Sequence, residues 1–235
     1  IMRTNRENRK IWGDFPASKT IDEYAQRKGW WSDGSERQGV PIQADEWVLA
    51  RALDGEEAPR GLIEIEPFGA AGTRRNILVS GAPVHDADGK IIGAVAAQMD
   101  ITDRVKAEKS LRESEAMFRT MTNAMPQIVW STDADGYHDY FNEQWYEFIG
   151  MPRGATDGEA WIDLIHPDDW DRTSEVWRHS LETGEAYEME YRVRNRFGQY
   201  RWTLARALPV RDEKGVIFRW MGTTTDIHEQ KMIQE

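Results

Sequence analysis

Clustered carboxylates are the side chains of this sequence that could most readily bind a metal ion or move a proton. Asp168, Asp169 and Asp171 follow Pro167 in a stretch that is typical of the first turn of a helix. Carboxylates are stabilised at the positive end of a helix dipole, which explains the cluster without an ion. Elsewhere, neighbouring carboxylates carry little information, because the chain contains 41 Asp and Glu residues. We therefore predict no metal site and no catalytic carboxylate pair.

The remaining catalytic chemistries lack their motifs in this sequence. The chain contains no cysteine, which excludes disulfides, thiolate metal sites, iron-sulfur clusters and cysteine nucleophiles. It also lacks a phosphate-binding glycine loop, a nucleophile elbow and a His-Glu-x-x-His motif. We predict that this segment has no catalytic residues, and we keep a small-molecule enzyme only as an alternative.

The net charge and the hydropathy of the sequence bear on its partners and its cellular location. Lys and Arg total 30 against 41 Asp and Glu, so the formal charge of −11 argues against a nucleic-acid partner. The longest apolar runs, such as Ile91–Ala97, are far shorter than the ~20 residues that span a bilayer. The charged N-terminus does not lead into a signal peptide. We expect a cytoplasmic chain with no membrane span in this segment.

The second half of the sequence predicts two strands, short helices and then three antiparallel strands. Asp133-Ala-Asp-Gly136 separates two short apolar runs, which is typical of a hairpin. Tyr187, Met189 and Tyr191 alternate with charged residues, the period-two pattern of a strand with one wet face. The expected strands are 127–132, 137–141, 187–193, 200–210 and 216–225, and the expected helices are 143–149, 159–165 and 167–183.

The first half repeats the end of this pattern. Asp212, Gly215 and the pair Asp226-Ile227 recur after Asp86, Gly89 and Asp100-Ile101 at the same spacing and without a gap. The first copy predicts strands over 62–67, 76–84 and 90–99, with a helix over 47–53. Its opening strand and part of the next are missing from the sequence, so we expect an N-terminally incomplete domain with an unpaired sheet edge.

This pattern resembles the PAS domain, a five-stranded antiparallel sheet with helices over one face. In the second copy the matching stretches are Phe141-Asn142, Phe148-Ile149-Gly150, Ile165-His-Pro-Asp-Asp169, Thr183-Gly-Glu185, Arg201-Trp202 and Gly222 through Asp226-Ile227. The first copy ends in Asp100-Ile101-Thr102-Asp103-Arg104, which resembles the PAC signal-transmitting motif of this family. We expect an α+β chain of two PAS-like domains, 1–104 and 118–230, joined by a helical linker, 105–117, with 231–235 beginning an output helix.

The resemblance implies a sensory or relay segment, as in the input region of bacterial sensor histidine kinases. The parent would then be an ATP-dependent protein histidine kinase, and a downstream kinase or other effector domain would be its partner. For signal transmission the resemblance implies Asp100, Ile101, Thr102, Asp226 and Ile227. The second copy has His228 where the first has Thr102, so coupling through a hydroxyl is not expected there.

The linker predicts a helix with an apolar seam. Leu111, Phe118 and Met125 fall at seven-residue steps, with Val105 one residue out of register. Sustained coiled coils need three or four heptads, so two interpretations stay open. The helix is either a parallel dimer seam through Leu111 and Phe118, giving a homodimer, or a solvated connector with Phe118 and Met121 under the second domain.

The aromatic residues suggest where a small-molecule ligand could bind. Relatives hold heme, flavin or metabolites between sheet and helices, and the candidate lining residues here are Trp130, Tyr140, Trp145, Trp161, Trp202 and Trp220. Large rings more often fill a core than frame a ligand. A flavin-cysteine adduct is excluded because there is no cysteine, and heme is not favoured. The histidines could bind heme iron through their ring nitrogens, but nothing else in the sequence supports that role. His166 is expected at the start of a helix instead.

Two other functions compete with a sensory relay. The chain could be a ligand-free structural dimerisation module with filled cores, or the input region of a cyclic-dinucleotide enzyme. A bound chromophore or metabolite would favour sensing, and the domain that follows in the parent protein would identify the output.

Overall fold

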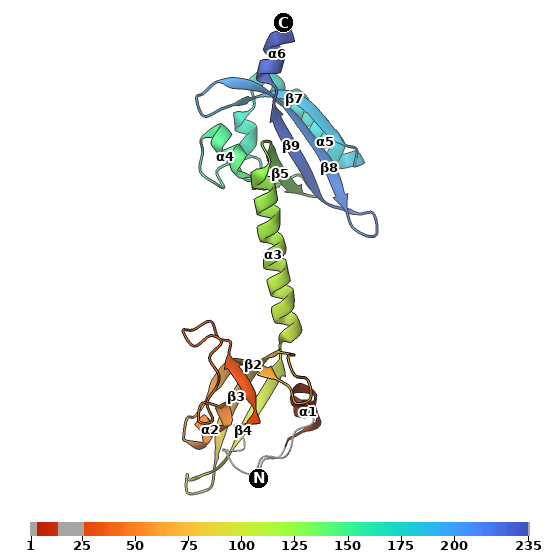
Figure 1. The fold of residues 1–235 in the computed structure, drawn as a ribbon. Coiled ribbons are helices and arrows are strands. Elements are labelled where there is room, and N and C mark those ends of the chain that lie inside the picture. The colour runs from red at the N-terminus through yellow and green to blue at the C-terminus, as the bar shows by residue number, and fades with distance from the viewer. Residues whose placement is uncertain (1–3, 14–25, 235) are drawn as a thin grey trace. The chain divides into compact units, whose positions relative to one another are not determined.

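The computed structural model describes residues 4–13 and 26–234, which form parts of two compact units, Ile1–Glu113 and Ser114–Glu235 (Figure 1). We call these unit 1 and unit 2. The boundary falls within helix α3 (Thr102–Ala124), which contains the expected linker range 105–117. Among the described residues, no helix is both long enough and apolar enough to cross a membrane.

Unit 2 contains a five-stranded antiparallel sheet in the order β6-β5-β9-β8-β7. Its strands are β5 (Ile128–Asp133), β6 (His138–Phe141), β7 (Tyr187–Arg194), β8 (Tyr200–Arg211) and β9 (Ile217–Asp226). The expected hairpin forms, with Asp133 accepting hydrogen bonds from the backbone N–H groups of Asp135 and Tyr137. Sequence and structure agree here because turn residues and alternating polarity both act locally.

Three helical elements cover one face of this sheet: α4 (Glu143–Ile149), the 3₁₀ helix η2 (Ala160–Leu164) and α5 (Pro167–Thr183). Helix α4 ends at Gly150, whose φ of 72° a side chain would disfavour. Helix α5 starts at Pro167 and is capped by His166, whose Nδ1 accepts a hydrogen bond from the backbone N–H of Asp168 at 3.2 Å. These helices bury the inward-facing residues of the sheet.

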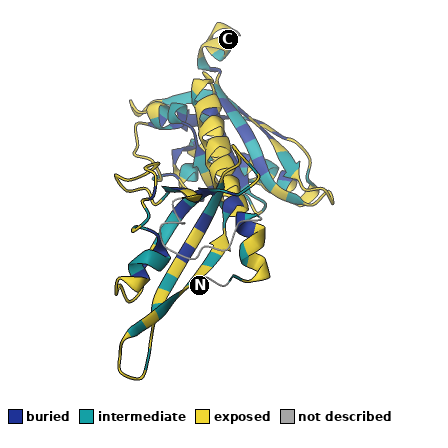
Figure 2. Cartoon of the chain, turned by 60° about the horizontal axis from the view of Figure 1, so that its bottom comes forward, coloured by how far each residue is buried: buried dark blue, intermediate teal, exposed yellow. Residues whose placement is uncertain are grey.

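Unit 1 contains a four-stranded antiparallel sheet in the order β1-β2-β3-β4. Its elements are α1 (Arg6–Trp12), β1 (Lys28–Trp31), α2 (Val48–Leu53), β2 (Arg60–Glu66), β3 (Arg75–His85) and β4 (Ile91–Asp100). Strand β1 was not predicted, because its four residues are too few for a period-two pattern and, unlike the equally short β6, no tight turn joins it to its partner strand. It pairs with β2, while the outer edge of β4 has no partner strand among the described residues. Buried and exposed positions alternate along these strands (Figure 2).

The two sheets repeat one another in detail. The β3–β4 pairing shifts register between Val84 and His85, and the β8–β9 pairing shifts between Val210 and Arg211, at the corresponding position. In both turns the aspartate, Asp86 or Asp212, accepts a hydrogen bond from the backbone N–H of the residue just before the next strand. The expectation of two α+β units built on antiparallel sheets is therefore confirmed.

The core of unit 2 is a packed group of aromatic rings. Trp130, Trp145 and Trp220 are buried, and Trp177 meets Trp220 edge to face with ring centroids 5.4 Å apart. Gly222 makes this packing feasible, because a Cβ there would lie 2.4 Å from the Trp130 ring. The ring therefore occupies the space that a side chain at residue 222 would need.

His138 lies inside this aromatic core. Its ring stacks on Phe141 with centroids 5.5 Å apart and lies 4.8 Å from the Trp161 ring. Burial lowers the pKa of His138 to about 4, although the Gly136 backbone and the charges of Asp139 and Asp133 act in the opposite direction. The imidazole is therefore neutral in the folded protein at neutral pH.

We predict that Gly222→Ala destabilises unit 2 by about 1 to 3 kcal/mol, because the added methyl group displaces the Trp130 ring. The measurement is urea unfolding of the chain followed by circular dichroism. Gly93→Ala in β4 is the matched control, since a Cβ there meets nothing within 4 Å, and it should change stability by less than about 0.5 kcal/mol. Equal stability of the two variants would contradict the packing described above.

We also predict that unit 2 loses about 2 to 3 kcal/mol of stability between pH 7 and pH 4.5. Above pH ~6.5 the imidazole is neutral in both the folded and unfolded chain. Between that pH and about 4, only the unfolded chain takes up a proton, so stability falls as pH falls. His138→Phe, which retains a ring, should flatten this dependence, whereas replacement of the exposed His179 by Asn should not. An unchanged slope in His138→Phe would refute the assignment.

Candidate functional site

The last strand of each sheet passes directly into a helix, and the two connections are built from corresponding residues. The first junction comprises Arg75, Asn76, Asp100, Ile101 and Thr102, where β4 meets α3. The second junction comprises Arg201, Trp202, Asp226, Ile227 and His228, where β9 meets α6 (His228–Gln234). All five residues predicted to transmit a signal lie in these two junctions. We treat the junctions as the candidate site.

In the first junction, one carboxylate joins the end of the sheet to the start of the helix. Oδ1 of Asp100 accepts hydrogen bonds from the backbone N–H of Thr102 at 3.0 Å and from its hydroxyl at 2.5 Å. The hydroxyl of Thr102, which is buried, accepts in turn from the backbone N–H of Asn76 on β3 at 2.9 Å. Arg75 adds a contact to Asp100 at 3.5 Å. Strand β3, the end of β4 and the first residue of α3 therefore form one hydrogen-bonded unit.

The second junction has the same plan with a tighter ion pair. Oδ1 of Asp226 accepts from the backbone N–H of His228 at 3.0 Å, and Nε of Arg201 lies 2.5 Å from Oδ2 of Asp226. The backbone N–H of Trp202 donates to Nδ1 of His228 at 3.4 Å. The imidazole thus occupies the acceptor position that the Thr102 hydroxyl occupies in unit 1.

The backbone at the two junctions is equivalent. The N–H of Ile101 donates to the carbonyl of Asn76, and the N–H of Ile227 donates to the carbonyl of Trp202, both at 2.9 Å. A displacement of the penultimate strand must therefore move the start of the following helix, or break hydrogen bonds. This arrangement performs no bond chemistry, but it couples the position of a strand to the position of a helix.

Some members of the junctions are not evident from the motif alone. The sequence motif includes the Asp-Ile pairs but indicates no role for Arg75, Asn76 or Arg201. The internal repeat could have indicated them, because Arg75 and Arg201 occupy corresponding positions in the two copies. Each comes one residue before the residue whose backbone N–H donates to the junction side chain. Trp202 was a candidate for a ligand pocket, yet in the structure its backbone serves the second junction.

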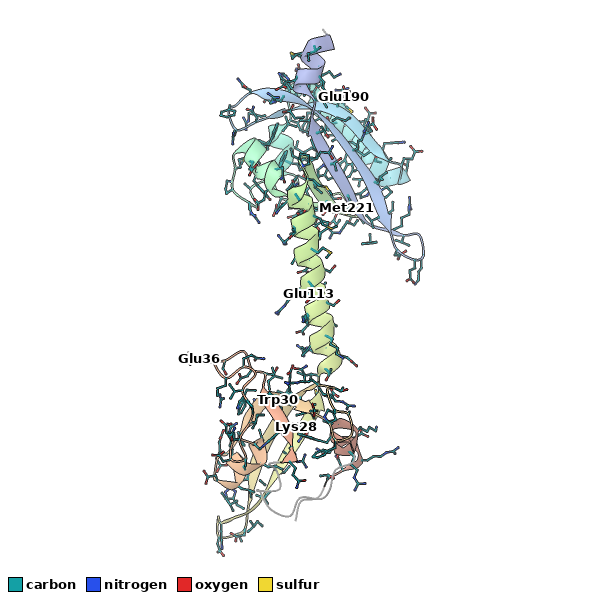
Figure 3. The ribbon with its side chains drawn as sticks, viewed as in Figure 1. Lys28, Trp30, Glu36, Glu113, Glu190 and Met221 are labelled. Atoms are coloured by element: carbon teal, nitrogen blue, oxygen red, sulfur yellow. The ribbon has the colours of Figure 1, made fainter. Side chains whose placement is uncertain are left out.

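Helix α6 is held against β7 and β8 by further charges. Nζ of Lys231 lies 2.5 Å from a carboxylate oxygen of Glu190 on β7 and 5.4 Å from the centroid of the Trp202 ring. Figure 3 shows Glu190 close to the start of α6. The guanidinium of Arg192 lies 5.1 Å from the centroid of the same ring. The first turn of α6 is therefore surrounded by charged side chains.

The acidic cluster at the start of α5 has a structural partner. Asp169 is buried and accepts from the Arg192 side chain at 2.8 and 3.0 Å and from the Arg192 backbone at 3.0 Å. Burial acts to raise the pKa of Asp169, but these hydrogen bonds outweigh it and lower the pKa below the ordinary value. The helix-dipole explanation was incomplete, because Asp169 also ties α5 to β7. Among the described residues, no group of three or more His, Asp or Glu side chains could hold a metal ion.

The predicted pocket residues separate into two groups. Trp130, Trp145 and Trp220 lie in the buried core, and Trp161 packs against it. Tyr140 lies on the other face of the sheet, where its hydroxyl is 2.6 Å from that of Thr122 and its ring contacts Phe118. Trp202 lies outside the core as well, because its neighbour Thr203 faces inward and strand residues alternate. Four of these six residues therefore pack between the sheet and the helices.

An apolar groove runs along the outer face of unit 2, between the C-terminal part of α3 and the sheet. It has a volume of about 540 Å³, and its apolar lining includes Phe118, Met121, Met125, Leu208 and Met221. Figure 3 shows Met221 beside α3. Phe118 is 37% exposed and Leu208 is 64% exposed, so the groove is only partly covered. Leu111, the other predicted seam residue, is 60% exposed on α3.

Comparisons with family models identify both units. The description "PAS fold" matches residues 138–224 and the description "PAS domain" matches residues 48–103. Among solved structures, the chain is 26% identical to the N-terminal domain of a diguanylate cyclase with PAS/PAC sensor from Marinobacter aquaeolei. That match covers 45% of this chain and 98% of the other, with a TM-score of 0.42.

Several curated proteins are similar over most of the chain. An uncharacterized protein from Sinorhizobium fredii is 34% identical over 62% of this chain and 17% of its own length. The peroxide stress-activated histidine kinase mak1 of Schizosaccharomyces pombe is 25% identical over 68% of this chain and 11% of its length. The two-component sensor PprA of Pseudomonas aeruginosa is 23% identical over 82% of this chain and 21% of its length.

The chain thus spans about a tenth to a fifth of these relatives. The two family matches fall in order along the chain, one in each unit, and each ends at or near its junction. Repeated sheets, repeated junctions and the two matches agree. The chain belongs to the PAS family and carries two PAS domains in tandem.

Proposed function

We propose that this chain is a sensory and signal-relay segment of a two-component sensor histidine kinase. The observation that carries the proposal is the repeated junction, in which an aspartate on the last strand binds the first residue of the next helix. The histidine kinase and two-component sensor among the relatives support the same class of parent protein. The ATP-dependent phosphorylation itself would belong to a domain outside this segment.

The relay works by shifting a balance between two arrangements of strand and helix. A ligand or an upstream change can shift that balance only by its difference in affinity for the two arrangements. Moving a population from 1:99 to 99:1 takes about 10⁴-fold, or roughly 5.5 kcal/mol. Loss of one hydrogen bond costs about 1 kcal/mol of stability. Each junction therefore has enough hydrogen bonds to bias the balance but too few to set it alone.

The input region of a cyclic-dinucleotide enzyme is the second candidate. It uses the same junctions and differs only in the attached output domain. The domain that follows Glu235 in the parent protein distinguishes these two candidates directly. A catalytic ATPase domain there supports the kinase, and a cyclase domain supports the alternative.

We predict that Asp100→Ala and Thr102→Val in the parent protein each change the basal rate of autophosphorylation by about threefold or more, because each variant removes hydrogen bonds that hold α3 to β3. The measurement is phosphate incorporation from labelled ATP. Asp103→Ala is the matched control, since Asp103 is exposed in the same turn. Wild-type rates in both folded junction variants would remove the relay assignment, and a parent with no phosphorylation would remove the kinase.

We further infer a homodimer that forms through α3 and the outer groove of unit 2. The large apolar side chains of Leu111, Met117 and Met121 are exposed on α3, and that of Leu208 is exposed on β8. Exposed apolar surface on a protein marks an interaction site, and twofold dimers are the commonest assembly. A ligand-free scaffolding module would use the same surface, so the dimer alone does not separate the two functions. A cytoplasmic location and a small-molecule ligand stay predictions.

We predict that the purified chain has the native mass of two copies, and that Leu111→Asp and Phe118→Asp shift it toward one copy. A carboxylate in an apolar contact costs several kcal/mol of desolvation. Ala116→Asp, at an exposed position on the opposite side of the same helix from Leu111 and Phe118, is the charge control. An absorbance scan and mass of the same sample test for bound chromophore or metabolite. A monomer at every concentration would exclude the dimer, and a colourless, ligand-free dimer would favour scaffolding.

A further inference from the structure

The two junctions differ in the chemistry of one acceptor. In unit 1 the backbone N–H of Asn76 donates to a hydroxyl, and in unit 2 the backbone N–H of Trp202 donates to an imidazole nitrogen. The surrounding residues correspond: an arginine before the donor, an aspartate at the strand end and an isoleucine between. The same strand-to-helix connection therefore occurs twice in this chain, once with a titratable acceptor and once without.

An imidazole can accept this hydrogen bond only in one form. Nδ1 of His228 is an acceptor when the ring is neutral and its proton is on Nε2. When the ring takes up a second proton, both nitrogens become donors, and the N–H of Trp202 then faces another N–H. Histidine is the side chain that ordinarily makes this change between about pH 5 and pH 8. The Thr102 hydroxyl keeps its acceptor lone pairs throughout that range.

The groups around His228 carry both signs of charge. On β9 and α6 they are Asp226, Glu229 and Lys231; on β8 and β7 they are Arg201, Glu190 and Arg192; and His166 contacts Tyr200, next to Arg201. The three carboxylates are already engaged. Asp226 and Glu229 are 2.5 and 3.6 Å from Arg201, and Glu190 is 2.5 Å from Lys231. Because Asp226 and Glu229 share one cation, Arg201, a protonated ring meets one more carboxylate than these ion pairs balance, and a charge partner is available to it.

We propose that the second junction is a proton-sensitive connection, in which protonation of His228 releases the N–H of Trp202 and loosens the start of α6 from β8. The first junction, with Thr102 at the corresponding position, is insensitive to protons over the same range. The hydrogen bond from Trp202 is present while the ring is neutral and is lost when the ring is protonated. The use of this device to modulate output rests on the proposed relay function, whereas the device itself does not.

Amide hydrogen exchange tests the connection in the chain itself. We compare protection of the Trp202 and Asn76 amides at pH 7.5 and 5.5, with exchange rates corrected for their intrinsic pH dependence. The Trp202 amide should lose about two- to tenfold of its protection at the lower pH, the equivalent of one hydrogen bond, while the Asn76 amide should not. Carboxylic acids ordinarily titrate near pH ~4, below this window.

Exchanging the acceptor side chains between the two junctions separates the effect of His228 from that of other titratable groups in unit 2. His228→Thr should remove the pH dependence at Trp202, and Thr102→His should create one at Asn76. His228→Gln, which retains an acceptor that does not titrate, serves if the threonine variant folds poorly. Protection at Ala205, farther along β8, reports any general loosening, including that caused by His138, and is compared across all variants. Replacing His166 by Asn controls for the other histidine near β8.

The outcomes separate the device from the relay. Equal pH dependence at Trp202 in wild type, His228→Thr and His228→Gln would overturn the proposal, as would a loss at Trp202 no larger than that at Ala205. A pH-dependent Trp202 amide that disappears in His228→Thr supports it. If that result is obtained but substitutions in both junctions leave the autophosphorylation rate of the parent unchanged, the relay function is refuted while the proton-sensitive connection is supported.

Discussion

Each unit depends on one carboxylate placed where its last strand ends. The aspartate there accepts the first backbone N–H of the following helix, and the adjoining side chain reaches back to a backbone donor on the neighbouring strand. The first N–H groups of any helix lack partners within the helix. Because the aspartate supplies a partner, the helix can begin directly at the sheet, and its start is tied to the pairing of the last two strands.

The helix-covered face of the unit 2 sheet depends on a different constraint, the close packing of large aromatic rings. Trp130 occupies the space above Gly222, and Trp177 contacts Tyr187 and Trp220 edge to face. Such contacts are specific in geometry as well as large in buried area. His138 is enclosed by the same rings, and burial keeps it neutral at physiological pH. The helix-covered side of the sheet is therefore closely packed, while the junction lies at the end of the strands.

The internal repeat lets one domain serve as a reference for the other. Sheet pairing, register shift and backbone hydrogen bonds are shared, so differences between the two junctions come from single side chains. The exchange of a hydroxyl for an imidazole preserves an acceptor within reach of the same amide. It also makes that acceptor conditional, because only the neutral ring has a free lone pair. A relay with two such connections could respond differently to conditions at each step.

The duplication, the hairpin turns, the succession of strands and the Asp-Ile positions follow from the amino-acid sequence, because turn chemistry and period-two polarity act over a few neighbouring residues. The sequence did not locate β1, a short strand whose partner β2 lies far along the chain, or the partners of Asp169. It also could not tell that Tyr140 and Trp202 lie apart from the buried rings. The face that each aromatic residue takes, and the backbone amide that each junction side chain meets, depend on how the strands are arranged in the fold. Those contacts join residues far apart in the chain, and their geometry follows from strand pairing and packing rather than from local pattern.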